Sequence, residues 1–198
     1  MEEFADIIGG KYTLEYGNEL LYIPRKGKWN LLAMEHSSGA VRSLADISFY
    51  LHHIAQKSDL LMIDEPELGL HPENQCRIAR LFARLVNLGV KVFITTHSDY
   101  IVKELNTLIM LNGDKPHLKR IAEENGYQED ELITAGQVKV YTAQEELLPL
   151  EEGQKRWRRG HTLVEADVHP ELGINAPSFN ETIDRMNNIV EDIIWGAE

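Results

Sequence analysis

The stretch LLMIDEPELGLHP, residues 60–72, holds an aliphatic run that ends on two acidic residues and a proline. Residues 60–63 favour a strand in a core, and Asp64 and Glu65 follow that strand directly. Adjacent carboxylates repel each other, and burial raises the free-energy cost of each unless a positive charge shares the site. The pattern therefore indicates a bound cation or a proton-transfer role at the end of this strand.

The residues after this stretch predict a second strand beside the first. Pro72 opens a helical pattern with apolar residues on one face, and Gly89 ends it. The segment VKVFITT, residues 90–96, is then expected to form a second buried strand, which gives a βαβ unit with parallel strands and a right-handed crossover. Because ligands gather beyond the carboxyl ends of parallel strands, we expect the acid pair and the TTH segment 95–97 to share one edge of the sheet.

Further elements flank this unit on both sides. We expect a hairpin over residues 11–23 with its turn at Gly17-Asn18, helices near 41–57 and 99–105, a strand over 107–111, a helix ending before Gly126, strands over 137–143 and 161–168, and a last helix opened by the capping-box pattern from Ser178 to Glu181. Strands that alternate with helices predict an α/β fold, layered about a mainly parallel sheet flanked by helices.

Composition limits the classes of function. The formal net charge of −12 over 198 residues argues against a surface that binds nucleic acid throughout, since phosphate binding needs a positive footprint. The short basic run at residues 155–159 is more typical of a solvated loop than of a binding patch. A single cysteine, Cys76, excludes an internal disulfide, and no apolar stretch is long enough for a membrane span. We therefore expect a cytoplasmic protein without a membrane partner.

Three segments resemble motifs of the ATP-binding-cassette (ABC) ATPase superfamily, in the order found there. HSSGAVRSL, residues 36–44, is similar to a degenerate signature motif, LLMIDEP to the Walker B motif, and VFITTHS, residues 92–98, to the switch-histidine strand. The segments DEPELGLHP and TTHSDYIV together most resemble those of bacterial AAA-type ATPases related to the overcoming-lysogenization-defect (OLD) nucleases. The closing segment, residues 175–195, resembles the C-terminal helix of that group.

This resemblance implies a role for each matching residue. It implies that Asp64 holds Mg²⁺ through water, that Glu65 acts as the catalytic base or orients the attacking water, and that His97 senses the γ-phosphate of ATP. The signature residues Ser37, Ser38 and Gly39 would face ATP held by a second subunit, and Gly69, Leu70 and His71 would lie in the dimer-contacting D-loop. The implied cofactor and substrate are Mg²⁺ and ATP, and the implied partners are a second copy of the complete protein and DNA or a partner protein.

One motif of the superfamily is absent from the sequence. A phosphate loop (Walker A) needs G-x-x-x-x-G-K-[ST], and neither Gly10-Lys11 nor Gly27-Lys28 has the earlier glycine. We therefore expect residues 1–198 to form a single partial ATPase domain without the N-terminal phosphate-loop part, inactive or weak alone. Its parts would be a β-rich segment (1–35), the signature and its helix (36–57), the Walker B and switch-histidine core (58–112), and C-terminal strands and helices (113–198).

Other interpretations of the same residues stay open. The chain could be a non-catalytic ABC-like module that binds and controls a partner, or a metal-dependent nuclease that uses Asp64, Glu65 and His97 directly as metal ligands. An acid pair at a strand end can also be a capping or solvated pair, and Ser37 to Gly39 can be a loop with a helix cap.

Overall fold

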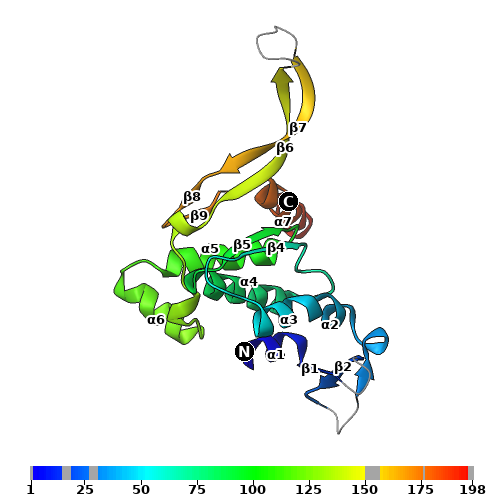
Figure 1. Cartoon of the computed structure of the whole chain (residues 1–198). Helices are drawn as coiled ribbons and strands as arrows, with labels where there is room; N and C mark the ends of the chain where they lie inside the picture. The colour runs from blue at the N-terminus through cyan, green and yellow to red at the C-terminus, as the bar shows by residue number, and fades with distance from the viewer. Residues whose placement is uncertain (1, 15–18, 27–30, 150–156, 176, 196–198) are drawn as a thin grey trace. The chain divides into compact units, whose positions relative to one another are not determined.

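The computed structural model describes residues 2–14, 19–26, 31–149, 157–175 and 177–195 (Figure 1). The chain divides into two compact units, residues 1–133 and residues 134–198. The candidate site residues all belong to the first unit. Along the described residues, no helix combines the length and the apolar character that a membrane span requires.

The first unit begins with a helix and a small antiparallel sheet. Helix α1 (Glu2–Ile8) precedes strands β1 (Gly10–Leu14), β2 (Leu20–Pro24) and β3 (Leu32–Ala33), which pair in that order. The β1–β2 pairing confirms the predicted hairpin, and its predicted turn residues, Gly17 and Asn18, lie outside the described residues.

A short 3-10 helix, η1 (Met34–His36), leads to α2 (Gly39–Ser43) and α3 (Ala45–His53). Together they cover most of the predicted helix near 41–57, and Leu44 between them is fully buried. The helical region begins two residues earlier than predicted, because the Ser38 side chain accepts a hydrogen bond from the Val41 N–H and caps α2. It ends at His53, so Ile54 lies outside the helix and is exposed.

The predicted βαβ unit is confirmed. Strand β4 (Leu60–Asp64) runs parallel to β5 (Lys91–Thr95), and α4 (Pro72–Asn87) connects them. One face of the strand pair and the apolar face of α4 share the core. The core residues from these elements are Leu61, Ile78, Ala79, Phe82 and Leu85, with Ile63, Val92 and Ile94 packed against them.

The opposite face of the β4–β5 pair differs from the prediction. Both strands were expected to be buried, yet Leu60, Met62 and Phe93 are 59%, 63% and 51% exposed. Met62 pairs with Phe93, so these residues lie on the face turned away from the core. The unbroken aliphatic run over residues 60–63 predicts a strand that is buried on both faces. No described element of the first unit covers this second face. We call Leu60, Met62 and Phe93 the exposed sheet face.

The predicted strand over residues 107–111 is wrong. These residues complete α5 (Asp99–Leu111), which buries Ile101, Leu108 and Leu111 at helical spacing. A short apolar run fits a strand or a buried helix equally well, and no glycine or proline interrupts this one. Helix α6 (Pro116–Glu124) follows, and Gly126 adopts a positive φ of 73° just beyond its end, as predicted.

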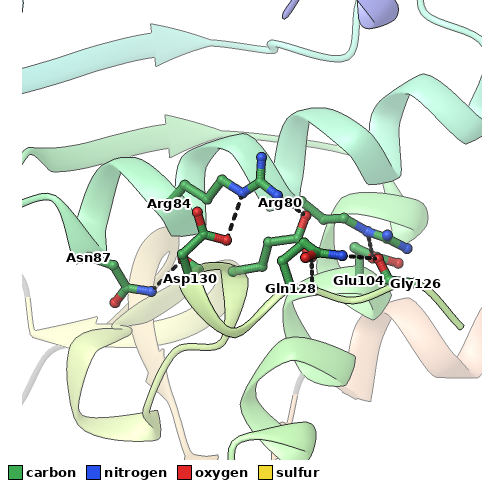
Figure 2. A network of polar contacts seen from close by, with 8 residues as sticks. Arg80, Arg84, Asn87, Glu104, Gly126, Gln128 and Asp130 are labelled. Atoms are coloured by element: carbon green, nitrogen blue, oxygen red, sulfur yellow. Dashed lines mark hydrogen bonds and ion pairs between the residues drawn. The ribbon is translucent and has the colours of Figure 1, made fainter. Parts of the chain in front are cut away.

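An ionic network joins α4, α5 and the segment after α6 (Figure 2). Arg80 Nε donates to Glu104 Oε1 at 2.5 Å, and Arg84 contacts Asp130 at 3.1 Å and Glu131 at 3.2 Å. Asp130 and Glu131 belong to the 3-10 helix η2 (Glu129–Glu131). Since Glu104 and Glu131 are buried, these arginines compensate carboxylates that would otherwise lie in the core without a counter-charge.

The second unit contains the other strands. The 3-10 helix η3 (Ala135–Gln137) precedes β6 (Val140–Pro149) and β7 (Trp157–Ala166), which form a long antiparallel hairpin; β8 (Val168–His169), β9 (Gly173–Ile174) and α7 (Pro177–Trp195) follow. The fold is therefore α/β, but the predicted mainly parallel sheet is wrong. Among the described strands, β4 and β5 form the one parallel pair, because 107–111 is helical and β6 pairs with its sequence neighbour β7.

Candidate functional site

Two strands end side by side and bring the acid pair next to residues 95–97. Asp64 pairs with Thr95 in the parallel register, and the Thr95 hydroxyl donates to Asp64 Oδ1. The Glu65 N–H donates to Thr95 Oγ1 at 3.2 Å and to the Thr95 carbonyl at 3.1 Å. The structure thus brings the acid pair and the TTH segment to one edge of the sheet, as the βαβ pattern predicts.

Glu65 has a backbone conformation that is rare for a residue with a side chain. Its φ is +46°, in the left-handed region that favours glycine. This conformation turns the chain directly after the strand, and Glu65 Oε1 lies 3.4 Å from His97 Nε2. The His97 side chain is 88% exposed and that of Glu65 34%, so the pair is open to a ligand from solvent. Strain retained at such a position is typical of functional sites.

Glu67 ties the loop after β4 to the loop after β5. Its Oε1 accepts hydrogen bonds from the Thr96 hydroxyl and from the His97 N–H, each at 2.7 Å. Its Oε2 is buried and has no hydrogen-bond partner among the described residues. The sequence motifs assign no role to Glu67. No local pattern marks it, because both donors lie about thirty residues further along the chain.

Gln75 makes a second connection between the same loops. From the first turn of α4, its amide donates to the Leu70 carbonyl at 2.9 Å and accepts from the Ser98 hydroxyl at 2.5 Å. Ser98 is buried and caps α5 by accepting a hydrogen bond from the Ile101 N–H at 3.2 Å. The start of α5 therefore has an anchor in addition to Glu67.

The three predicted signature residues lie at the start of α2 and are oriented differently from one another. Ser37 is buried, and its hydroxyl donates to the Ala33 carbonyl at 3.2 Å. Ser38 is exposed and caps α2. Gly39 is exposed, and a Cβ at this position would meet nothing within 4 Å. Ser38 and Gly39 are thus accessible to a phosphate group, whereas the Ser37 hydroxyl is held within the chain.

The predicted D-loop residues lie against the signature segment of the same chain. Gly69 has a φ of +73°, and a Cβ at this position would lie 3.2 Å from the Ala40 nitrogen. The Ser43 hydroxyl donates to the Leu68 carbonyl at 3.3 Å. Leu70 is buried, and His71 caps α4 through its ring nitrogen. The segment after β4 therefore contacts the loop after β5 at one end and α2 at the other.

The donor set at this edge suits a metal ion that arrives with phosphate groups. The described residues contain no group of three or more His, Cys, Asp or Glu side chains that could hold a metal on their own. Asp64 and Glu65 place two carboxylates at the end of β4. Mg²⁺ commonly binds one or two carboxylates of a protein, while phosphates and water complete its coordination shell.

Comparisons with known proteins point to ATPases. Residues 10–102 match the family model of the AAA ATPase domain. The chain is 30% identical over 90 residues to the energy-coupling factor transporter ATP-binding protein EcfA of Carboxydothermus hydrogenoformans, covering 40% of this chain and 33% of the relative. It is 29% identical over 85 residues to EcfA2 of Streptococcus sanguinis, covering 42% of this chain and 29% of the relative.

A solved structure from work on ATP-driven dimerization and DNA-stimulated activation of SMC ATPases is also similar, with a TM-score of 0.48 and 17% identity over 92% of this chain and 87% of that chain. The chain spans about a third of the length of the curated relatives it matches. The family model and the two relatives support a P-loop ATPase superfamily and similarity to ATP-binding AAA and ABC proteins. The matched residues 10–102 include the candidate signature, acid pair and His97.

Proposed function

We propose that this chain, similar to AAA and ABC ATPases over residues 10–102, supplies the Walker B, signature and switch-histidine elements of an ABC-type ATPase of the OLD-related group. The observation that carries the proposal is the placement of Asp64, Glu65 and His97 at the shared end of β4 and β5, with Glu65 and His97 3.4 Å apart. A cytoplasmic location is part of this proposal.

Each residue has a distinct role in ATP hydrolysis. Asp64, oriented by the Thr95 hydroxyl, would hold Mg²⁺ through water. The ion, when bound, neutralises charge on the phosphates. Glu65 orients and polarises the attacking water, and the exposed imidazole of His97 donates a hydrogen bond to the transferred phosphoryl group as negative charge develops there.

The signature segment extends the proposal to a dimer. Ser38 and Gly39 are exposed at the start of α2, and the N-terminus of a helix favours an anion. In the complete protein these residues would face the γ-phosphate of ATP held by a second copy, with Gly69, Leu70 and His71 near the same interface. DNA or a partner protein is the proposed recipient of the ATP-driven change.

The phosphate-loop part of the ATPase is proposed to cover the exposed sheet face. Parallel strands are normally covered on both faces, and the aliphatic run over residues 60–63 has the composition of such a strand. The exposure of Leu60, Met62 and Phe93, together with the absence of a Walker A sequence, supports a core that another segment completes. The chain alone should therefore bind Mg-ATP weakly and hydrolyse it negligibly.

Two measurements test this function. Isothermal titration of Mg-ATP into the 198-residue chain should give weak binding, and tight binding by the chain alone would contradict the proposal. Supplying a phosphate-loop segment, fused upstream of Met1 or as a separate chain, should then produce ATP turnover that Glu65→Gln abolishes.

A non-catalytic interaction module is the second candidate, and the exposed sheet face is the observation that favours it. In that case the phosphate-loop segment would bind the chain, with binding measurable by titration, yet no turnover would appear. A nuclease that uses the same residues as metal ligands is the weakest candidate. It requires DNA cleavage supported by Mg²⁺ or Mn²⁺ without ATP and lost in Glu65→Gln.

A further inference from the structure

We propose that Glu67 is a positioning residue, whose carboxylate fixes the β5–α5 loop so that His97 faces Glu65. The catalytic consequence of this role rests on the proposed ATPase function, whereas the positioning itself can be measured on the chain alone.

The His97 ring is not held by packing. Its side chain is 88% exposed, and its contact with Glu65 Oε1 at 3.4 Å joins two groups that are both open to water. Exposed ion pairs of this kind contribute little free energy and do not immobilise a side chain. The direction of the imidazole therefore depends on the backbone that carries it.

Glu67 controls that backbone through one oxygen. Oε1 accepts from the Thr96 hydroxyl and from the His97 N–H, each at 2.7 Å, so it fixes the Thr96 rotamer and the orientation of the peptide between Thr96 and His97. Hydrogen bonds to an ionised carboxylate are roughly twice as strong as those between neutral groups. The Thr96 hydroxyl also accepts from the Ser98 N–H at 3.0 Å, so the effect of Glu67 extends across the loop.

The unfavourable burial of the Glu67 carboxylate also supports a positioning role. The other carboxylate oxygen, Oε2, is buried without a hydrogen-bond partner among the described residues, which is unfavourable for folding. An unsatisfied polar atom kept in a structure calls for an explanation, and a positioning role provides one. Because Gln75 independently anchors Ser98, loss of Glu67 should free Thr96 and His97 without unfolding α5.

Three substitutions separate position from charge. Glu67→Ala removes the acceptor. Glu67→Asp keeps the charge but draws the acceptor back by one methylene. Glu67→Gln keeps a carbonyl oxygen at the right distance and removes the charge. Glu73→Ala is the matched control, because Glu73 is an exposed glutamate that pairs with Arg77 on the surface of α4.

Amide hydrogen exchange followed by NMR on the 198-residue chain is the first readout. We expect the His97 amide to exchange about 10- to 100-fold faster in Glu67→Ala and Glu67→Asp. Glu67→Gln should give a smaller increase, because its neutral oxygen still accepts but more weakly, and Glu73→Ala should stay within about threefold of wild type. Amides in the core of α4 should keep their wild-type rates. An unchanged His97 rate, or an equal acceleration at every amide, would overturn the proposal. If Glu67→Ala does not fold, the Asp and Gln variants decide.

The second readout is kcat against KM in the ATPase completed with a phosphate-loop segment. We expect Glu67→Ala and Glu67→Asp to lower kcat about tenfold or more with little change in KM, and Glu67→Gln to restore most of it. If Glu65→Gln is inactive while Glu67→Ala and Glu67→Asp keep the wild-type kcat, the positioning role is wrong. If Glu65→Gln is as active as wild type, the proposed function fails, and the exchange data still decide the positioning role.

Discussion

At the scale of single residues, Glu65 combines a strained backbone with the proposed chemistry. Its φ of +46° is costly for any residue with a Cβ, and its carboxylate faces His97 at 3.4 Å. Substitutions at this position can therefore separate what stability requires from what hydrolysis requires.

Glu65→Gln should leave folding nearly unchanged and stop hydrolysis. Glutamine keeps a hydrogen-bonding group of the same size but cannot accept a proton from water, so we expect kcat to fall about 10²- to 10⁴-fold in the completed ATPase. An ATP-bound dimer should accumulate and be visible by light scattering. A wild-type rate would exclude Glu65 as the catalytic base.

Glu65→Gly should increase the stability of the chain. Glycine adopts a positive φ at no steric cost, so the free energy of unfolding should rise by up to about 1 kcal/mol in urea denaturation. Glu73→Gly is the control. Glycine in the first turn of α4 should lower the free energy of unfolding by about the same amount. A loss of stability in Glu65→Gly would show that the side chain contributes more than its conformation costs.

At the scale of elements, the loop after β4 is packed between the loop after β5 and the start of α2. Glu67 contacts the loop that carries His97, while Gly69 lies against the first residues of α2. Gly126 is a reference for measuring the strength of this packing. It has the same φ of +73° as Gly69, but a Cβ on Gly126 would meet nothing within 4 Å.

Gly69→Ala should destabilise the chain more than Gly126→Ala does. Both alanines carry the cost of a positive φ, about 1 kcal/mol, but at residue 69 the new methyl would also press against the Ala40 nitrogen at 3.2 Å. We expect a total of about 2–3 kcal/mol at Gly69, measured by chemical denaturation. Equal effects in the two variants would mean that the loop and α2 separate easily.

The contact between α4 and α5 depends on a buried ion pair. Arg80 lies over the Tyr127 ring at 4.0 Å and donates to Glu104, which is 7% exposed. Burial and the nearby Glu104 carboxylate together raise the pKa of the Tyr127 phenol, so Tyr127 stays neutral at physiological pH.

Arg80→Ala should lower the free energy of unfolding by about 2–3 kcal/mol, because it leaves the Glu104 carboxylate buried without a counter-charge. Arg77→Ala is the matched control on the same helix. Its ion pair with Glu73 is exposed, so the change should stay below about 1 kcal/mol. Similar losses in both variants, measured in urea, would show that the Arg80 pair is not buried in solution.

At the scale of the whole molecule, the exposed sheet face separates what this chain can do alone from what it is proposed to do when completed. Phe93→Glu should leave the melting temperature of the chain nearly unchanged, because the side chain is 51% exposed, but should abolish binding of a phosphate-loop segment. Leu172→Glu, at an exposed position of the second unit, is the control and should bind normally. Normal binding by Phe93→Glu would place the segment elsewhere.

The sequence by itself determined the βαβ unit and the grouping of Asp64, Glu65 and His97 at its edge. An aliphatic run that ends on Asp64 and Glu65, a helix bounded by Pro72 and Gly89, and a second strand ending at residues 95–97 are local patterns, and parallel pairing brings their ends together in any fold that contains them. The α/β class, the first hairpin and the end of α6 just before Gly126 also follow from local signals in the sequence.

Only the tertiary structure decided the rest, because the deciding interactions join residues far apart in the chain. The run at 107–111 is helical because Leu108 and Leu111 pack on the same face as Ile101, and β6 pairs with β7 rather than joining a parallel sheet. The contacts of Glu67 with Thr96 and His97 span about thirty residues, a distance over which no sequence period operates. Pattern fixes which groups stand at the end of a strand, whereas packing fixes what holds them there.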